Sequence, residues 1–370
     1  MGIVSLSVVS LRNHKQEQFI FSEGVTVIWG DNGSGKTTVL EGIHLLTYGK
    51  SFKTHKQNQL IQQGKKTAII KGVFLKNQRE DVVAAQIEKT NRRKIKLNGK
   101  NILNRKDLIG RNNVVVLSPE EQPITKGSPL QRRQFIDKMF SISNSQYIET
   151  LQLYNRALKQ RNAVLIEIKE NRQNRDQLEY WNSQVSIYAE NLWEKRTEKM
   201  KQFNKIFLSV IKKYDKEINL ILKYNIKTKT KDEILKALKK NEQNDIKRGR
   251  TSTGPHLDDL LLLWNNKNIR IYGSQGEHKL SLFLLKVSEM LFLKEQTGFF
   301  PTLLLDDLFA KIDLERSIKI VSILNKIGLK QKVKAQTIIT TTDILNVEKS
   351  GLLEEYKDTK TIKLERSCNI

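Results

Sequence analysis

The chain has 370 residues, of which 38% are hydrophobic, enough for two or three compact domains and too many for a disordered chain. Its single cysteine, Cys368, excludes a disulfide framework, and no apolar stretch reaches the ~18 residues that cross a membrane, so we expect a cytoplasmic protein without membrane attachment. The 65 lysines and arginines against 40 aspartates and glutamates give a formal charge of +25, which favours a polyanionic partner, nucleic acid before an anionic membrane.

The first third of the chain is predicted to consist mostly of strands. Apolar runs of strand length lie at 3–11, 19–21, 25–29, 68–75, 82–88, 95–97 and 114–117. The run at 25–29 stops at a glycine, and a helical pattern follows it over 36–48. Asn98-Gly99 is a strong hairpin turn between two of the strands.

The middle of the chain has a different pattern. Residues 130–214 contain no proline and no glycine, and two series of apolar residues with helical spacing predict a helical hairpin connected at 171–176. Its first helix, over 145–169, has a length of about 37 Å, which makes a short arm and no extended coiled coil. A strand at 218–224 and a helix at 231–240 follow.

The alternation of strands and helices returns after the basic run at 247–250. We expect strands at 260–264, 269–272, 302–305 and 337–340, and helices at 277–296 and 313–326. The simplest organisation is an α/β domain formed by residues 1–118 and 249–370, split by a helical insertion at 119–248.

A phosphate-binding motif, GxxxxGK[ST], lies between the strand at 25–29 and the helix at 36–48. Glycines let successive backbone N–H groups turn toward phosphate oxygens, and the start of the helix adds a favourable dipole. Lys36 is expected to reach the β- and γ-phosphates of ATP, and the Thr37 hydroxyl to bind Mg²⁺. The candidate ATP-binding residues are Gly30, Asp31, Asn32, Gly33, Ser34, Gly35, Lys36, Thr37 and Thr38.

Two carboxylates end an apolar strand far along the chain, in the segment PTLLLDD over 301–307. One acid at the tip of such a strand holds Mg²⁺, and its neighbour orients and deprotonates the attacking water. We assign the first role to Asp306 and the second to Asp307, so that the candidate catalytic residues are Lys36, Asp306 and Asp307. The alternative is a pair of helix-capping aspartates.

A third motif, YGSQGEHK, places serine and glycine at the start of the helix expected over 277–296. The Ser274 hydroxyl and exposed N–H groups there would form a second anion site. Because a chain with one phosphate-binding loop needs no second γ-phosphate receptor of its own, we expect this loop to reach the nucleotide of another copy. A plain N-cap at Ser274 is the alternative.

The order of these motifs resembles the ABC-type ATPase heads of the SMC and Rad50 class, and more closely the RecF family of bacterial recombination mediators. The resemblance covers the whole chain and rests on the segments LRNHKQEQFIF, GDNGSGKTTVLEGIHLLTYGKSF, SPEEQPITKGSPLQRRQFID, YNRALKQRN, GPHLDDL, YGSQGEHK and PTLLLDDLFAKID. It implies an α/β fold, a P-loop ABC-type ATPase head with a mixed sheet and flanking helices, split by an inserted helical domain.

The resemblance also implies a mechanism. Two copies are expected to enclose ATP and Mg²⁺ in shared sites, in which Arg12 joins the residues in cis. The alternative for Arg12 is a solvated arginine at the end of a strand. The residues in trans are expected to be Ser274, Gln275, Gly276, Lys279 and Asp313. The family implies a homodimer that clamps double-stranded and gapped DNA, a weak DNA-stimulated ATPase that releases the clamp, and RecR- and RecO-like partners that load RecA.

Several positions depart from the family pattern. Leu257 replaces an arginine of GPHRDDL, and Glu277 and His278 replace the usual residues after the signature glycine. The D-loop reads Ala-Lys-Ile-Asp at 310–313, and threonines occupy 340–342, where most ABC ATPases have a switch histidine. We expect ATP-driven dimerisation to be retained despite these changes. We expect the changes to affect the fine regulation of ATP hydrolysis.

Basic pairs and clusters are candidates for contacts to DNA phosphates, although each is also compatible with a solvated surface. The candidates are Arg92, Arg93, Lys94, Lys195, Arg196, Lys247 and Arg248.

Two other classes of protein share the fold. A Rad50- or SMC-type tether needs hundreds of coiled-coil residues, and a transporter ATPase subunit usually carries an LSGGQ-type signature and a switch histidine, which this chain lacks.

Overall fold

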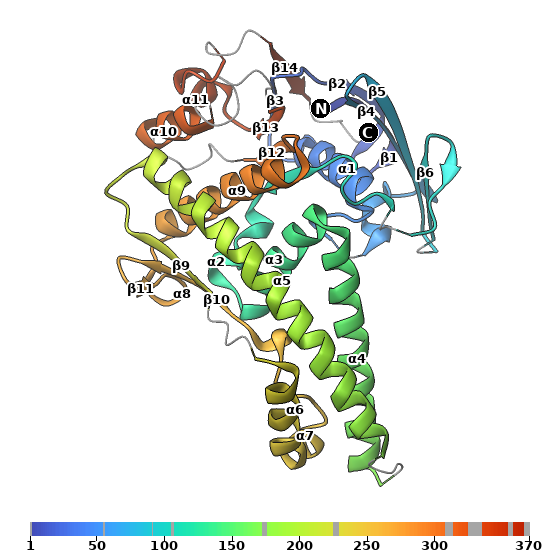
Figure 1. Cartoon of the computed structure of the whole chain (residues 1–370). Helices are drawn as coiled ribbons and strands as arrows, with labels where there is room; N and C mark the ends of the chain where they lie inside the picture. The colour runs from blue at the N-terminus through green and yellow to red at the C-terminus, as the bar shows by residue number, and fades with distance from the viewer. Residues whose placement is uncertain are drawn as a thin grey trace. The chain divides into compact units, whose positions relative to one another are not determined.

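A computed structural model describes residues 2–54, 56–90, 92–104, 107–171, 176–224, 229–307, 314–324, 335–353 and 358–365. The chain forms two compact units (Figure 1). The head unit comprises Met1–Gln122, Lys212–Lys216 and Leu282–Ile370, and the helical unit comprises Pro123–Ile211 and Glu217–Ser281. In the described ranges no helix is both long and apolar enough to span a membrane.

The first sheet of the head unit has six antiparallel strands in the order β2-β1-β4-β5-β6-β7. Its strands are β1 (Gly2–Leu11), β2 (His14–Ile20), β4 (Thr67–Lys76), β5 (Arg79–Glu88), β6 (Arg93–Leu97) and β7 (Lys100–Asn101). Alternate residues of these strands are buried, as in a sheet with one face on the core.

The second sheet has five parallel strands in the order β14-β3-β13-β12-β8. They are β3 (Val25–Gly30), β8 (Val114–Leu117), β12 (Thr302–Asp306), β13 (Thr337–Thr341) and β14 (Thr359–Leu364). The three strands β8, β12 and β13 are buried at every position, which is why their sequences are continuous and mostly apolar.

Helix α1 (Lys36–Tyr48) contacts strands of both sheets, and every residue in it except Thr37 is buried. The first sheet accommodates it closely at Gly72, where an added Cβ would lie 2.6 Å from the Leu46 side chain. The described part of the head unit also contains the helices η1 (Gln57–Leu60), η3 (Pro119–Glu121), α10 (Leu314–Leu324) and α11 (Ile344–Lys349).

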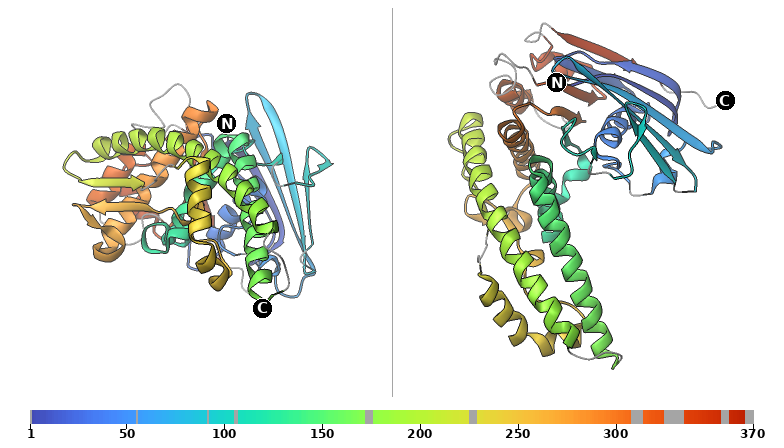
Figure 2. Two further views of the ribbon diagram at one scale, coloured as in Figure 1. Left: turned by 60° about the horizontal axis from the view of Figure 1, so that its bottom comes forward. Right: turned by 45° about the vertical axis from the view of Figure 1, so that its right-hand side comes forward.

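The helical unit contains α2 (Pro123–Lys126), α3 (Pro129–Ser143), α4 (Ser145–Lys169), α6 (Lys231–Lys240), α7 (Glu242–Arg248), η4 (Pro255–Leu257), α8 (Ile269–Tyr272) and the strands β9 (Leu220–Tyr224), β10 (Leu260–Trp264) and β11 (Lys267–Asn268). Two long helices belong partly to each unit, α5 (Asp176–Tyr214) and α9 (Gln275–Thr297). Helices α4 and α5 run side by side (Figures 1 and 2), joined by a core of Val164, Leu165 and Leu178.

The fold class is the one predicted, and the helix expected over 36–48 is confirmed. The strand expected at 269–272 is wrong. The Asn268 side chain accepts a hydrogen bond from the Arg270 N–H at 3.0 Å and starts the short helix α8 instead. Residues 249–281, which we expected in the α/β domain, group with the helical unit because β10 pairs with β9.

Candidate functional site

The phosphate-binding loop lies at the carboxyl end of β3 and leads directly into α1. Gly30, Gly33 and Gly35 have φ angles of 150°, 85° and 100°, a region that side chains rarely adopt. The Lys36 ammonium folds over the loop and donates hydrogen bonds to the carbonyls of Gly30 at 2.7 Å and Asp31 at 2.8 Å. The loop is therefore closed around the lysine that the motif assigns to phosphate.

Asp306 lies at the tip of β12, two strands from the phosphate-binding loop in the parallel sheet. The Thr37 hydroxyl lies 2.9 and 3.1 Å from its two carboxylate oxygens, and the Thr340 hydroxyl donates to it at 2.7 Å. Burial raises the pKa of Asp306, and the hydrogen bonds from Thr340 and Thr37 oppose that rise. A buried carboxylate beside a hydroxyl is an oxygen ligand set that Mg²⁺ favours.

The residues present fit ATP as well as Mg²⁺. Ser34 is 4% exposed, and its buried hydroxyl has no hydrogen-bond partner among the described residues. A buried hydroxyl is costly without a partner, and a phosphate oxygen would supply one.

Asp307 faces differently from its neighbour because its backbone is left-handed, with a φ of 53°. Its N–H group donates to both the carbonyl and the hydroxyl oxygen of Thr340 at 3.1 Å, and its side chain is exposed. Burial lowers the pKa of Lys36, and the charge of Asp307 is the largest influence opposing that shift. The backbone conformation thus separates a buried carboxylate from an exposed one at adjacent positions.

The segment Arg12-Asn13-His14, in the turn between β1 and β2, supports the phosphate-binding loop. The Asn13 amide donates to the Gly33 carbonyl at 2.9 Å, and the His14 ring lies 3.1 Å from the Gly35 carbonyl. An added Cβ at Gly35 would collide with the His14 ring and lie 2.9 Å from the Asn13 amide nitrogen, so the close approach requires glycine. This support was not predicted from the sequence.

Arg12 itself forms a two-pronged ion pair with the buried Glu41 of α1, with distances of 2.6 and 2.9 Å. Glu41 also accepts a hydrogen bond from the Ser51 hydroxyl. The contact of Arg12 with nucleotide stays a prediction. The ion pair with Glu41 is by itself sufficient to explain why Arg12 lies beside α1.

Two charged residues beside Asp306 were also missed. Lys53 and Glu120 form an ion pair at 3.9 Å, and their charges act on the pKa of Asp306 after burial and its hydrogen bonds, Glu120 raising it and Lys53 lowering it. Glu120 follows β8, whose last residue Leu117 pairs with Leu305. The sequence signal was the SPEE segment directly after a buried strand, because parallel strands end at the same edge of a sheet.

The serine of the signature motif caps α9 within the helical unit. The Ser274 N–H donates to the Glu277 carboxylate at 2.7 Å, and the Glu277 N–H donates to the Ser274 hydroxyl at 3.2 Å. Ser274 and Gln275 are exposed, while Gly276 and Lys279 are half-buried. Ser274 therefore acts as the N-cap of α9, which is the alternative role expected for it. Its contact with the nucleotide of a second copy stays a prediction. Asp313 lies outside the described residues.

The basic candidates lie in different environments. Arg92, Lys94, Lys247 and Arg248 are exposed, and Lys195 is half-buried. Arg93 is half-buried and donates a hydrogen bond to the Gly49 carbonyl at the end of α1.

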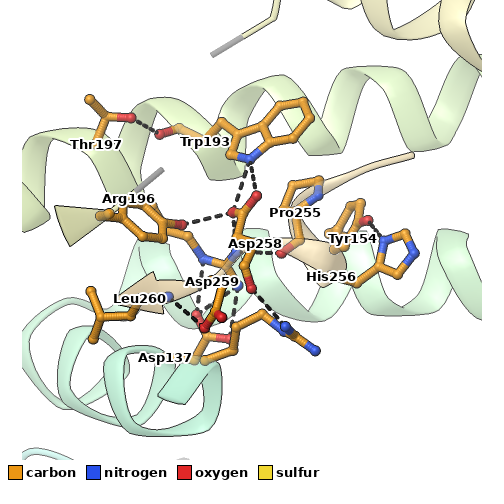
Figure 3. Close-up of polar contacts among 12 residues, drawn as sticks. Asp137, Tyr154, Trp193, Arg196, Thr197, Pro255, His256, Asp258, Asp259 and Leu260 are labelled. Carbon is orange, nitrogen blue, oxygen red and sulfur yellow. Dashed lines mark hydrogen bonds and ion pairs between the residues drawn. The ribbon is translucent and has the colours of Figure 1, made fainter. Parts of the chain in front are cut away.

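The prediction that Arg196 contacts DNA is wrong. Its side chain is 2% exposed and forms ion pairs with Asp137 at 2.9 Å and Asp258 at 3.0 Å (Figure 3). Asp258 also accepts hydrogen bonds from Trp193 and Tyr224, so the GPHLDDL segment is fixed in a polar cluster inside the helical unit. A buried, doubly paired guanidinium is not available to a phosphate.

The fold and this site define an ABC-type ATPase head. The family described as AAA domain matches residues 5–252. The DNA replication and repair proteins RecF of Clostridium perfringens and Clostridium botulinum are each 34% identical to the chain. The first match covers 93% of the chain and 94% of the relative, and the second covers 100% and 99%.

Solved structures agree with these relatives. A structure of the recombination mediator protein RecF with ATP aligns with a TM-score of 0.83 at 28% identity over 92% of both chains. An SMC head bound to a ScpA domain aligns at 0.57 with 16% identity over 94% of this chain and 92% of the other, a likeness of fold. The chain belongs to the RecF family of DNA replication and repair proteins.

Proposed function

We propose that the chain is a cytoplasmic ATPase in which ATP joins two copies around DNA and hydrolysis releases them. The observation that carries this proposal is the pairing of Thr37 with Asp306, 269 residues apart in the sequence, directly beside the phosphate-binding loop. That pairing supports the proposal because it brings together, from both halves of the head unit, residues proposed to hold a nucleotide and its metal ion. RecF relatives, one of them solved with ATP, support the same function.

In the proposed site the phosphates of ATP replace the loop carbonyls as partners of Lys36, and the Ser34 hydroxyl gains the partner it lacks. Thr37 and Asp306 hold Mg²⁺. When bound, Mg²⁺ offsets the charge that develops on the phosphates. Lys53 and Glu120 balance the charge around Asp306.

Asp307 is proposed to orient the attacking water and to accept its proton. Its exposed carboxylate and its left-handed backbone set it apart from the metal-binding Asp306. In the dimer, Ser274, Gln275, Gly276 and Lys279 of the second copy meet the γ-phosphate across the interface. The helix dipole at the start of α9 favours an anion there, and the Ser274 hydroxyl, which accepts a hydrogen bond from the Glu277 N–H, keeps its own hydrogen to donate.

The surplus of positive charge supports DNA as the partner, and membership of the RecF family supports a role in repair. We propose that the dimer holds duplex DNA near single-stranded gaps, that DNA stimulates its slow ATPase, and that RecR- and RecO-like mediators act with it to load RecA. The solved relative is described as acting in the RecFOR pathway.

Binding to labelled duplex, gapped and single-stranded oligonucleotides, with and without ATP and Mg²⁺, tests this function. We expect ATP to raise the affinity for duplex and gapped DNA by about tenfold, a difference of ~1.4 kcal/mol. The logarithm of the affinity should fall linearly with the logarithm of salt concentration. A flat salt response, or affinity that ATP leaves unchanged on every substrate, would count against the proposal.

A further inference from the structure

The outer face of the six-stranded sheet is open. Helix α1 lies against the other face (Figure 2), where Leu6, Ile70 and Val83 are buried. The strand registers define the outer positions, and none of them is buried. They are Ser5, Ser7 and Val9 on β1, Gln16, Gln18 and Ile20 on β2, Thr67, Ile69, Lys71, Val73 and Leu75 on β4, Glu80, Val82, Ala84, Gln86 and Glu88 on β5, Lys94 and Lys96 on β6, and Asn101 on β7.

Lys71, Lys94 and Lys96 carry the positive charge on these positions, and the register places two carboxylates, Glu80 and Glu88, on the same face at the two ends of β5. Lys71 pairs with Ala84, and Ala84 pairs with Lys96, so the two lysines lie two strands apart in one row, or ~10 Å. Lys94 is two residues along β6 from Lys96, or about 7 Å. No ion pair with a described residue is found for Lys71, Lys94 or Lys96.

Further positive charge adjoins this face at one end of the sheet. Lys66, Lys89 and Arg92 are exposed in the turns that flank β4, β5 and β6. Glu88 lies on the same face at this end of the sheet, opposite Thr67, and accepts a hydrogen bond from the Thr90 hydroxyl. Lys71, Lys96, Lys94 and Arg92 therefore follow one another across the face, with Glu88 beside Arg92.

We infer that this outer face, centred on Lys71, Lys94 and Lys96, binds the phosphate backbone of double-stranded DNA. The inference rests on the proposed function. Of the three lysines, only Lys94 is a DNA-contact candidate from the sequence alone. The spacing of Lys94 and Lys96 is close to the rise of two base pairs, since each strand of DNA presents a phosphate every ~3.4 Å.

The other side chains on the face favour a duplex over a single strand. Single-stranded nucleic acid is bound by stacking its bases on aromatic rings, and no outer position carries one. Serine and glutamine side chains, such as Ser7 and Gln86, are typical partners of backbone phosphates. The small Ser7 and Ala84 lie beside Lys71 and leave its ammonium accessible.

The test is the salt dependence of duplex binding by a triple variant, Lys71→Gln, Lys94→Gln and Lys96→Gln. Each phosphate contact contributes about 0.9 to the slope of log affinity against log salt concentration. We expect the slope to fall by about 2 to 3 units. ATP turnover without DNA should stay unchanged, because none of the three lysines lies in the nucleotide site.

A matched control removes three exposed lysines of the helical unit, by Lys236→Gln, Lys240→Gln and Lys267→Gln. This control should change the slope by less than about one unit. Replacing Lys71, Lys94 and Lys96 by arginine should restore the wild-type slope, which separates charge from folding.

Equal slopes in the triple variant and the control would overturn the inference while leaving DNA binding itself intact. If the wild-type protein itself showed no salt-dependent binding to duplex DNA, the proposed function would be contradicted instead. Loss of binding to anionic vesicles, with duplex binding retained, would assign the face to a membrane and overturn the inference as well.

Discussion

Asp307→Asn is expected to lower ATP turnover by at least ~100-fold, the usual effect of removing a general base, while leaving the affinity for ATP within about twofold. The substitution suits the site because asparagine tolerates the left-handed backbone that Asp307 adopts, with a φ of 53°. Lys36, Thr37 and Asp306 are untouched, so nucleotide and metal should still bind. Single-turnover hydrolysis and equilibrium binding of a fluorescent ATP analogue measure the two effects.

Asp306→Asn is the matched control at the adjacent position. It removes a buried carboxylate that accepts hydrogen bonds from Thr37 and Thr340, so we expect it to weaken Mg²⁺-dependent ATP binding. If Asp307→Asn abolished nucleotide binding and Asp306→Asn only slowed turnover, the roles of the two aspartates would be the reverse of those proposed.

A mixture of two inactive variants is expected to regain activity. Lys36→Ala should weaken ATP binding because it removes the charge that faces the β- and γ-phosphates. Ser274→Arg should leave ATP binding to a single copy nearly normal and block dimerisation with a bulky cation. In a mixed dimer both lesions fall in one shared site, and the other site keeps an intact Lys36 and an intact Ser274. Turnover should recover to at most about half of the wild-type value if the sites are independent, because each mixed dimer holds one intact site of two.

Ser274→Ala controls for the capping role of this serine. It removes the hydrogen bond to the Glu277 N–H at a cost of about 1 kcal/mol in helix stability, without adding bulk or charge. Thermal unfolding of both variants separates that loss from the effect on dimerisation. Normal dimerisation by Ser274→Arg alone, or no recovery in the mixture, would contradict the shared site.

The nucleotide site was largely predictable because its chemistry is local in the sequence. The phosphate-binding motif and the helix at 36–48 follow one another, and a run of apolar residues predicts the strand that ends at Asp306. The partners that position these residues come from other segments. Thr340, Glu120 and Lys53 could not be assigned without the order of strands in the parallel sheet, which no local pattern specifies.

The basic residues show more clearly what cannot be predicted from the sequence alone. Lys195 and Arg196 are neighbours with the same charge, yet α5 turns Arg196 inward to Asp137 and Asp258, which lie 59 and 62 residues away in the sequence. Lys71 and Lys96 were not linked to Lys94, because they meet only through the register of β4, β5 and β6. Helix α8 lies where the sequence predicts a strand, because four residues are too few for periodicity to distinguish a helix from a strand.

The most direct measurement is the mass of the complex that the Asp307→Asn protein forms with a labelled gapped duplex. Sedimentation with ATP and Mg²⁺ should give two chains on each DNA molecule, since the nucleotides would be bound but not hydrolysed. Without nucleotide, the protein should sediment as one chain and hold DNA at least tenfold more weakly. A single chain on DNA in the presence of ATP, or the same two-chain complex without nucleotide, would contradict a dimer that ATP assembles around DNA.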